Sequence, residues 1–348
     1  MPNSASDNAL REKTLGCILG VAIGDAMGLP VECKSPAITR ENHGFIDDYI
    51  SNKGHAYKSV TRRGPGTVSD DTQLTLALMD SFSRAGYSIE DLRKAHVEAY
   101  EGKWGKPVGW GGTTRKSIQM IKDGQNPSYV EEGAGNGPCM KIAPLSILYV
   151  YKCSRSQHGK FTNSYNASLL KRCREITEIS HGDPRCVVAT YCQARMIVRT
   201  LQNEIPEFSR QIAKLFIEDA LYAESRLEFP DNMQLISDRL SEFLNQDMFD
   251  LETGVVSVKI CQAQSSFVMN SYPLVAYCAC KYLPYKNFQY AVTHTVNAGA
   301  DADSNGAMVG AMMGSYLGYT GIPLQLVKGM KQWKMVLREA RKFEESIR

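Results

Sequence analysis

The sequence lacks the cysteine patterns that would indicate a structural metal or a disulfide framework. Its ten cysteines are scattered, with no C-x-x-C pair and no histidine and cysteine cluster at zinc spacing. Cys278 and Cys280 are the closest two. Scattered cysteines are typical of buried free thiols in a reducing compartment, so we predict a cytoplasmic protein.

The chain also lacks an excess of charge, a signal peptide and a long apolar run. Its formal net charge is +3, and it has no lysine and arginine block of the kind that binds phosphate backbones, so no nucleic-acid partner is predicted. The polar N-terminus "MPNSASDNALREK" has neither the basic nor the apolar region of a signal peptide. The apolar stretch from Leu15 to Pro30 is interrupted by Asp25 and is too short for the roughly 20 residues of a membrane span. No membrane association is predicted.

Strand signals are sparse, and the best are "ILYVY" from Ile147 and "VVSVKI" from Val255. Helical periodicity is abundant, because apolar residues recur every three or four positions from Leu15 and again from Leu74. Further helices are expected over residues 89–100, 113–122, 167–178, 186–201, 210–224, 231–244, 273–281, 288–296 and 305–319.

No linker divides the 348 residues convincingly. We interpret residues 1–9 as a polar N-terminal tail and the polar stretch near 154–166 as a surface insertion. The prediction is an all-α protein, a single compact multi-helix bundle that spans residues 1–348.

Four glycines near the C-terminal end recur every four residues, at Gly306, Gly310, Gly314 and Gly318. Each costs a helix interior about 1 kcal/mol relative to alanine, so such a helix needs compensation. Close approach of another backbone is the usual compensation. We therefore expect this helix to be central and to hold rigidly whatever lies at its N-terminus.

Two acidic motifs precede predicted helices. The first, "VSDDTQL", places Asp70 and Asp71 before the hydroxyl of Thr72, and the second, "NAGADADSN", places Asp301 and Asp303 before a serine. Either motif alone could simply cap its helix, because aspartate and serine are preferred there. Capping needs only one acid, however. Four carboxylates with two hydroxyls form a hard-oxygen ligand set suited to Mg²⁺ or Mn²⁺, and two cations become plausible if the helix starts meet.

The chain resembles the ADP-ribosylglycohydrolase family, which includes ADP-ribosyl-arginine and ADP-ribosyl-serine hydrolases and the dinitrogenase reductase-activating glycohydrolase. The matching pieces follow the family's order over most of the chain. They are "GVAIGDAMGLPVE" (Gly20–Glu32), "SDDT" (Ser69–Thr72), "GWGGTT" (Gly109–Thr114), "GAGNGPCMKIAPL" (Gly133–Leu145), "SHGDP" (Ser180–Pro184) and "GADADSNGAMVGAMMG" (Gly299–Gly314). The resemblance implies one bundle of α-helices around a binuclear metal site.

Carried over residue by residue, the resemblance implies two sets of site residues. The metal ligands would be Asp70, Asp71, Thr72, Asp301, Asp303 and Ser304, with Glu32 and Asp303 as the catalytic carboxylates. The substrate contacts would be Gly111, Gly112, Gly135, Asn136, Gly137, Met140 and His181, with Phe267 stacking on the adenine.

The sequence departs from the family's pattern at three places. Lys141 stands where arginine is usual, which keeps the charge but loses bidentate geometry. Ser304 replaces the more frequent threonine and keeps the hydroxyl. Ser265 and Ser266 stand where many members have glycines before the aromatic residue.

The activity implied by the resemblance is metal-dependent hydrolysis at the anomeric carbon of ADP-ribose attached to a protein side chain, arginine first and serine second. Two divalent cations, Mg²⁺ or alternatively Mn²⁺, would be the cofactors. An ADP-ribosylated protein or a small molecule that contains ADP-ribose would be the partner. Two other interpretations remain: a non-catalytic ADP-ribose-binding or structural member of the same fold, and, from the acids alone, a two-metal phosphoesterase.

Overall fold

The computed structural model describes residues 4–55, 57–127, 129–155, 162–261 and 266–348, and helices dominate all of them. In chain order the elements are α1 (Ser4–Gly28), η1 (Leu29–Val31), α2 (Pro36–His43), α3 (Lys58–Thr61), α4 (Asp70–Ala85), α5 (Ile89–Tyr100), α6 (Gly112–Lys122), α7 (Gly137–Met140), α8 (Ala143–Ser154), α9 (Asn163–Thr177), α10 (Pro184–Leu201), α11 (Ser209–Glu224), α12 (Ile236–Phe243), α13 (Gln246–Phe249), α14 (Thr253–Cys261), α15 (Val268–Tyr282), η2 (Leu283–Tyr285), α16 (Phe288–Val296), α17 (Ala302–Leu317), η3 (Tyr319–Gly321), α18 (Leu324–Gly329) and α19 (Trp333–Ile347). The described residues contain isolated β-bridges but no strand. The all-α prediction is confirmed.

Both strand signals were wrong, because both segments are helical. "ILYVY" lies in α8, whose residues 143–151 are all buried. A helix that is apolar all round shows no contrast between two faces, so its sequence resembles a buried strand. "VVSVKI" lies in α14, where packing overrides the strand propensity of valine and isoleucine.

Several expected boundaries also shift. The part of the expected N-terminal tail that is described, residues 4–9, is the first turns of α1. The helix expected from Pro273 begins at Val268 and contains that proline. In the expected insertion near 154–166, residues 156–161 lie outside the described residues, and α9 begins at Asn163.

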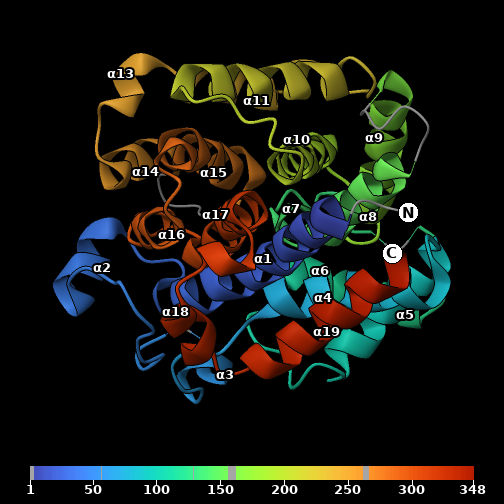
Figure 1. The fold of residues 1–348 in the computed structure, drawn as a ribbon, viewed down its shortest axis with the longest axis horizontal. Coiled ribbons are helices and arrows are strands. Elements are labelled where there is room, and N and C mark those ends of the chain that lie inside the picture. Colours follow the sequence, from blue (N-terminus) through green and yellow to red (C-terminus); the bar gives the residue numbers. More distant parts are fainter. Residues whose placement is uncertain (1–3, 56, 128, 156–161, 262–265) are drawn as a thin grey trace.

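The antiparallel pair of α1 and α17 lies at the centre of the molecule, with other helices on both sides (Figure 1). Glycines face one another along the whole contact. A Cβ on Gly310 would lie 2.1 Å from the carbonyl oxygen of Gly20, and one on Gly306 would lie 2.6 Å from that of Gly24. The close backbone approach expected from the glycine repeat is therefore present, and its partner is α1.

The expectation that the apolar stretch around Asp25 is too short to span a bilayer was wrong. The segment Asp7–Val31 is long and apolar enough to cross a bilayer by composition, and the apolar window within it is entirely buried inside the protein. Its apolar surface is covered inside the protein, mainly by α17.

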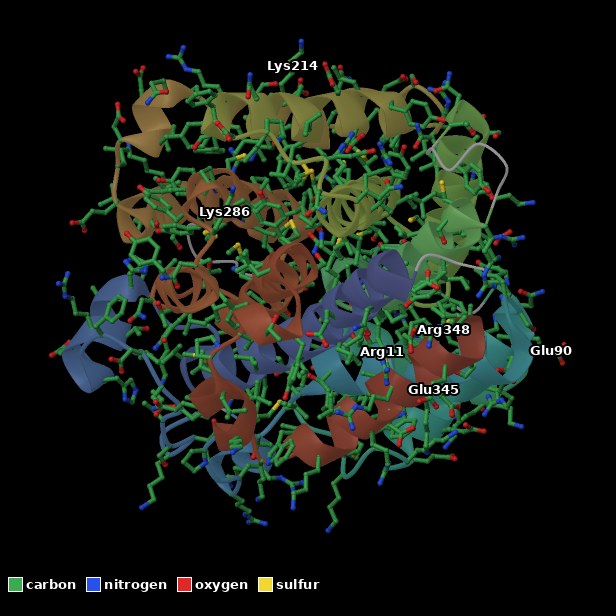
Figure 2. All side chains as sticks on the ribbon, in the orientation of Figure 1. Arg11, Glu90, Lys214, Lys286, Glu345 and Arg348 are labelled. Atoms are coloured by element: carbon green, nitrogen blue, oxygen red, sulfur yellow. The ribbon has the colours of Figure 1, made fainter. Side chains whose placement is uncertain are left out.

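Outer helices enclose this pair in layers. In Figure 1, α10 and α15 lie between the central pair and α11, while α4 and α19 cover the opposite side. Side chains fill the space between the ribbons, and the labelled Lys214 of α11 points away from the body (Figure 2). The layers hold the central pair in place, and the acidic motifs lie at one end of it.

The last helix is fastened to the first through a buried carboxylate. Glu344 of α19 is 0% exposed. Its Oε1 accepts a hydrogen bond from the hydroxyl of Tyr151 at 3.0 Å. Arg11 and Arg348, both labelled in Figure 2, approach it at 3.6 and 4.0 Å. This arrangement supplies partners for a charge that would otherwise be costly to bury.

Candidate metal centre

Three helix ends meet at one end of the central pair. The antiparallel packing brings the C-terminal end of α1, with Asp25, beside the N-terminus of α17, with Asp301 and Asp303. The N-terminus of α4, with Asp70 and Asp71, packs against both helices. The two acidic motifs, more than 200 residues apart in the chain, therefore converge as expected.

The carboxylates form two clusters that share Asp303. One oxygen each from Asp25, Asp71 and Asp303 lie within 4.8 Å of one another, and so do oxygens of Glu32, Asp301 and Asp303. All are buried except Glu32, which is partly exposed. Two carboxylate clusters with one common member make this a candidate site for a pair of divalent cations.

Asp25 is a member that the sequence interpretation missed. Its carboxylate accepts hydrogen bonds from the backbone N–H groups of Ser69, at 2.9 and 3.0 Å, and of Thr72, at 3.1 Å. The hydroxyl of Thr72 also donates to it at 2.5 Å. Asp25 thus joins α1 to the N-terminus of α4.

The hydroxyl that approaches Asp71 is that of Ser69, not that of Thr72. Ser69 Oγ donates to Asp71 Oδ2 at 2.8 Å, whereas Thr72 points to Asp25. In the second motif Ser304 Oγ donates to the sulfur of Met140 at 3.5 Å, and the backbone N–H of Ser304 donates to Asp303 at 3.0 Å. The predicted ligands Thr72 and Ser304 therefore lie at the site with their hydroxyl groups turned to neighbouring side chains.

The electrostatics of the clusters fit bound cations. Burial, with a smaller contribution from neighbouring carboxylates, raises the pKa of Asp301 to about 7 and those of Asp71 and Asp303 well above their usual range. Burial also raises the pKa of Asp25 to about 6. Asp71 Oδ1 is buried and accepts no hydrogen bond from the described residues. A divalent cation would both neutralise this charge and coordinate that oxygen.

Asp70 lies beside the clusters without contributing an oxygen to either. Burial raises its pKa, and Glu32 and Asp25 add to the effect. Its Oδ1 would lie 2.9 Å from a Cβ on Gly109, whose φ is +79°, so glycine is required there.

Lys141 is buried, donates to His96 Nε2 at 2.9 Å and has its pKa lowered to about 7 by burial.

Glu32 is held by a histidine that the sequence interpretation also missed. His55 Nε2 lies 3.0 Å from Glu32 Oε2, and the histidine side chain is 1% exposed. The backbone N–H of Tyr57 donates to His55 Nδ1 at 3.1 Å. Because Nδ1 accepts, the proton of neutral His55 is on Nε2, and this nitrogen donates to Glu32.

The segment that carries Glu32 is tied to the segment that carries Asp301. Cys33 N donates to Ala300 O at 2.7 Å, and Ala300 N donates to Lys34 O at 2.8 Å. Gly299 has φ +67°, and a Cβ there would lie 2.4 Å from Lys34 O. This paired backbone fixes Glu32 relative to the second motif.

Two of the predicted substrate contacts, Asn136 and Met140, have side chains that contact residues of the second acidic motif. The side-chain amide of Asn136 donates to Asp301 Oδ2 at 2.5 Å and to Ser271 Oγ at 2.8 Å. The sulfur of Met140 accepts a hydrogen bond from the hydroxyl of Ser304. Their side chains therefore orient residues of the second motif, while the backbone of the loop remains the candidate contact to substrate.

His181 packs against two of the other predicted contacts, Gly135 and Gly137. A Cβ on Gly137 would lie 3.0 Å from the ring of His181, and one on Gly135 would lie 3.2 Å from its Nε2. Burial lowers the pKa of His181 to about 3, so its ring is neutral. Gly111 and Gly112 are exposed, and a Cβ on either would meet no heavy atom within 4 Å.

Phe267 lies beside the glycine loop. It forms an isolated bridge with Gly135, is partly exposed, and has the guanidinium of Arg185 5.2 Å from its ring centroid. Of the two preceding serines, Ser265 lies outside the described residues, and the carbonyl of Ser266 accepts from Asn136 N at 3.0 Å. The ring is therefore near the loop that was predicted to bind the diphosphate.

Comparisons with known proteins show similarity over most of the chain. The family model described as ADP-ribosylglycohydrolase matches residues 6–347. An ADP-ribosyl-[dinitrogen reductase] glycohydrolase of Rhodospirillum rubrum is 24% identical over 320 residues, which cover 90% of this chain and 89% of that protein. ADP-ribosylarginine hydrolase Tri1 of Serratia proteamaculans is also 24% identical over 320 residues, covering 90% of this chain and 73% of that protein. A solved chain from an ADP-ribosylglycohydrolase-related protein complex shares the fold, with a TM-score of 0.65 at 20% identity over 98% of this chain and 100% of that one.

Proposed function

The chain belongs to the ADP-ribosylglycohydrolase family and is a hydrolase, and from this premise we propose that it removes ADP-ribose from a modified protein side chain in a metal-dependent reaction. The bond cleaved is the one at the anomeric carbon of the distal ribose. The observation that carries the proposal is the pair of carboxylate clusters that share Asp303, one of which includes Glu32.

The residues that would hold the cations come from both motifs and from α1. Asp25, Asp71 and Asp303 supply one set of oxygens, and Asp301, Asp303 and Glu32 supply the other. Mg²⁺ is our first choice and Mn²⁺ the second, because every donor is a hard oxygen. When bound, the cations supply Lewis-acid polarisation and lower the pKa of a water molecule.

Glu32 is the candidate general base. Glycosidic bonds break through an oxocarbenium-like transition state, and a carboxylate removes the proton from the attacking water or handles the proton of the leaving group. The N–H of His55 Nε2 holds Glu32 Oε2 and so fixes the orientation of the carboxylate. A fixed orientation of the base contributes to the rate because reacting groups must be aligned.

The glycine loop from Gly135 to Gly137 is the candidate cradle for the diphosphate. The ring of neutral His181 packs against both glycines, so the loop backbone is positioned by a buried side chain. Exposed backbone N–H groups of such loops suit phosphate oxygens. Binding energy from this remote part of the substrate would position the scissile bond.

Arginine is our first choice of acceptor and serine the second. The support for arginine is that a relative named ADP-ribosylarginine hydrolase aligns over 90% of this chain.

The proposal is tested by incubating the protein and Mg²⁺ or Mn²⁺ with arginine-linked and serine-linked ADP-ribosyl peptides, and separating the products by chromatography. Intact ADP-ribose should appear with the arginine-linked peptide, and Asp303→Asn and Asp71→Asn should each abolish its release. Asp231→Asn, which changes an exposed carboxylate outside the clusters, should act like the wild type.

Each alternative function predicts a different experimental result. Tight binding of ADP-ribose by calorimetry without any release from either peptide would favour a non-catalytic binding protein. Release of AMP or inorganic phosphate would favour a phosphoesterase. Wild-type turnover by both cluster variants would refute the proposed site.

A further inference from the structure

A large cavity lies where α2, α14 and α16 come together, at the left of Figure 1. Its volume is about 950 Å³, which is in the size range of cavities that bind small organic ligands. None of its lining residues belongs to the two carboxylate clusters. The proposed function assigns it no role.

Aromatic rings form one wall of this cavity. His294 lies 5.2 Å from Phe45, 4.0 Å from Tyr290 and 5.5 Å from Tyr282, measured between ring centroids. Phe45 is 54% exposed and Tyr290 is 39% exposed, so ring surface remains available to a ligand. A wall of this kind favours a planar aromatic group, which can stack on the exposed rings.

Hydrogen bonds hold the residues of this aromatic wall in place. His294 Nδ1 donates to the carbonyl of Tyr290 at 2.8 Å, which leaves Nε2 as the nitrogen that can accept. Tyr282 pairs with the hydroxyl of Thr253. Asn297 exchanges hydrogen bonds with the backbone of Ile46 at 2.9 and 2.7 Å, which ties the segment after α2 to α16.

The charges of the lining favour an anion. Arg40 of α2 and Lys259 of α14 are both exposed, and neither forms an ion pair among the described residues. Lys281 adds a third cation, held by the carbonyl of Leu251. Glu252 is the lone carboxylate among the described lining residues, and a carboxylate is the acceptor that binds sugar hydroxyl groups in nucleotide sites.

We propose that this cavity is a second ligand site that takes a mononucleotide, with the base on the aromatic wall and the phosphate near Arg40 and Lys259. Its position links it to the acid clusters. Pro36 lines the cavity, and a Cβ on Gly299 would lie 3.0 Å from Pro36 N, so α2 packs directly against the turn before Asp301. The proposal does not depend on the proposed function.

Calorimetric titration with AMP tests the site, with adenosine and inorganic phosphate as separate probes. AMP should bind at least about 10-fold more tightly than either probe, because only AMP offers both a stacking ring and an anion. The double variant Arg40→Glu, Lys259→Glu should weaken AMP binding by about 10-fold or more, since two cations become anions. Its melting temperature and its release of ADP-ribose should stay at the wild-type level.

Photolabelling with 8-azido-AMP and peptide mapping locates the bound nucleotide. Label on peptides within residues 36–46 or 282–297 supports the proposal. Label confined to residues 133–140 or to Phe267 overturns it, because AMP would then occupy only the proposed substrate site. Equal AMP affinity in the wild type and the double variant also overturns it, as does adenosine or phosphate binding as tightly as AMP.

Discussion

Without divalent cations, the protein should lose stability as the pH rises from about 4 to about 7. The cause is the burial of carboxylates whose pKa values are raised in the folded state, to about 6 for Asp25 and about 7 for Asp301, from 3.8. Below 3.8 these groups are protonated in both states. Between 3.8 and the raised values the unfolded chain binds fewer protons, so the free energy of unfolding falls with increasing pH.

The magnitude follows from the pKa of one group. Moving the pKa of Asp25 from 3.8 to about 6 corresponds to a loss of about 3 kcal/mol at neutral pH. A chain of 348 residues has an unfolding entropy of about 0.7 kcal/mol/K, so this loss lowers the melting temperature by about 4 °C. Asp301 adds to the effect, although coupled carboxylates do not contribute additively.

The assay is a series of melting curves between pH 4 and 8 after chelation, repeated with saturating Mg²⁺. Magnesium should raise the melting temperature most at the high end, where the carboxylates are ionised, and a concentration of 100 times Kd should add about 2.7 kcal/mol. Asp25→Asn should flatten the metal-free profile and reduce the effect of magnesium, whereas the exposed Asp231→Asn should not. A metal-free melting temperature that is constant or rises over this range would refute the reasoning.

Three further predictions concern the packing, the base and the cofactor. Gly310→Ala should destabilise the protein by about 3 kcal/mol or more in urea unfolding, because its Cβ would lie 2.1 Å from Gly20 O, while Gly112→Ala, whose Cβ meets open space, should have little effect. His55→Ala should lower kcat by about 10-fold or more and leave KM nearly unchanged. His55→Gln should recover part of the loss, because glutamine keeps a hydrogen-bond donor to Glu32. A wild-type kcat in the alanine variant would contradict this role. Chelation should abolish release of ADP-ribose, and adding Mg²⁺ or Mn²⁺ back should restore it; full activity after exhaustive chelation would contradict metal dependence.

The class of fold could be predicted from periodicity, and the central helix from its glycines. What periodicity could not supply is the partner of that helix. The matching glycines of α1, such as Gly20 and Gly24, have the same spacing, but they lie in an apolar run that reads only as a buried helix. The errors at α8 and α14 have the same origin, since tertiary packing decides between helix and strand in short apolar segments.

The acid-bearing turns of the site could be predicted because two acids beside a hydroxyl exceed what a helix cap requires. Asp25 was missed because a single acid in an apolar helix carries no spacing signal, although its place between two small residues in "GDA" is unusual for a core helix. His55 was missed because its link to Glu32 depends on a loop, residues 44–55, that has no periodic pattern. The direction of the Thr72 hydroxyl likewise depends on where α1 ends.

Diffraction from crystals grown with Mn²⁺, recorded at the manganese absorption edge, tests the central claim most directly. The account predicts two anomalous peaks about 3.5–4 Å apart, one beside Asp25 and Asp71, the other beside Glu32 and Asp301, with Asp303 between them. No peak at this place, or a single peak bound elsewhere, would contradict it.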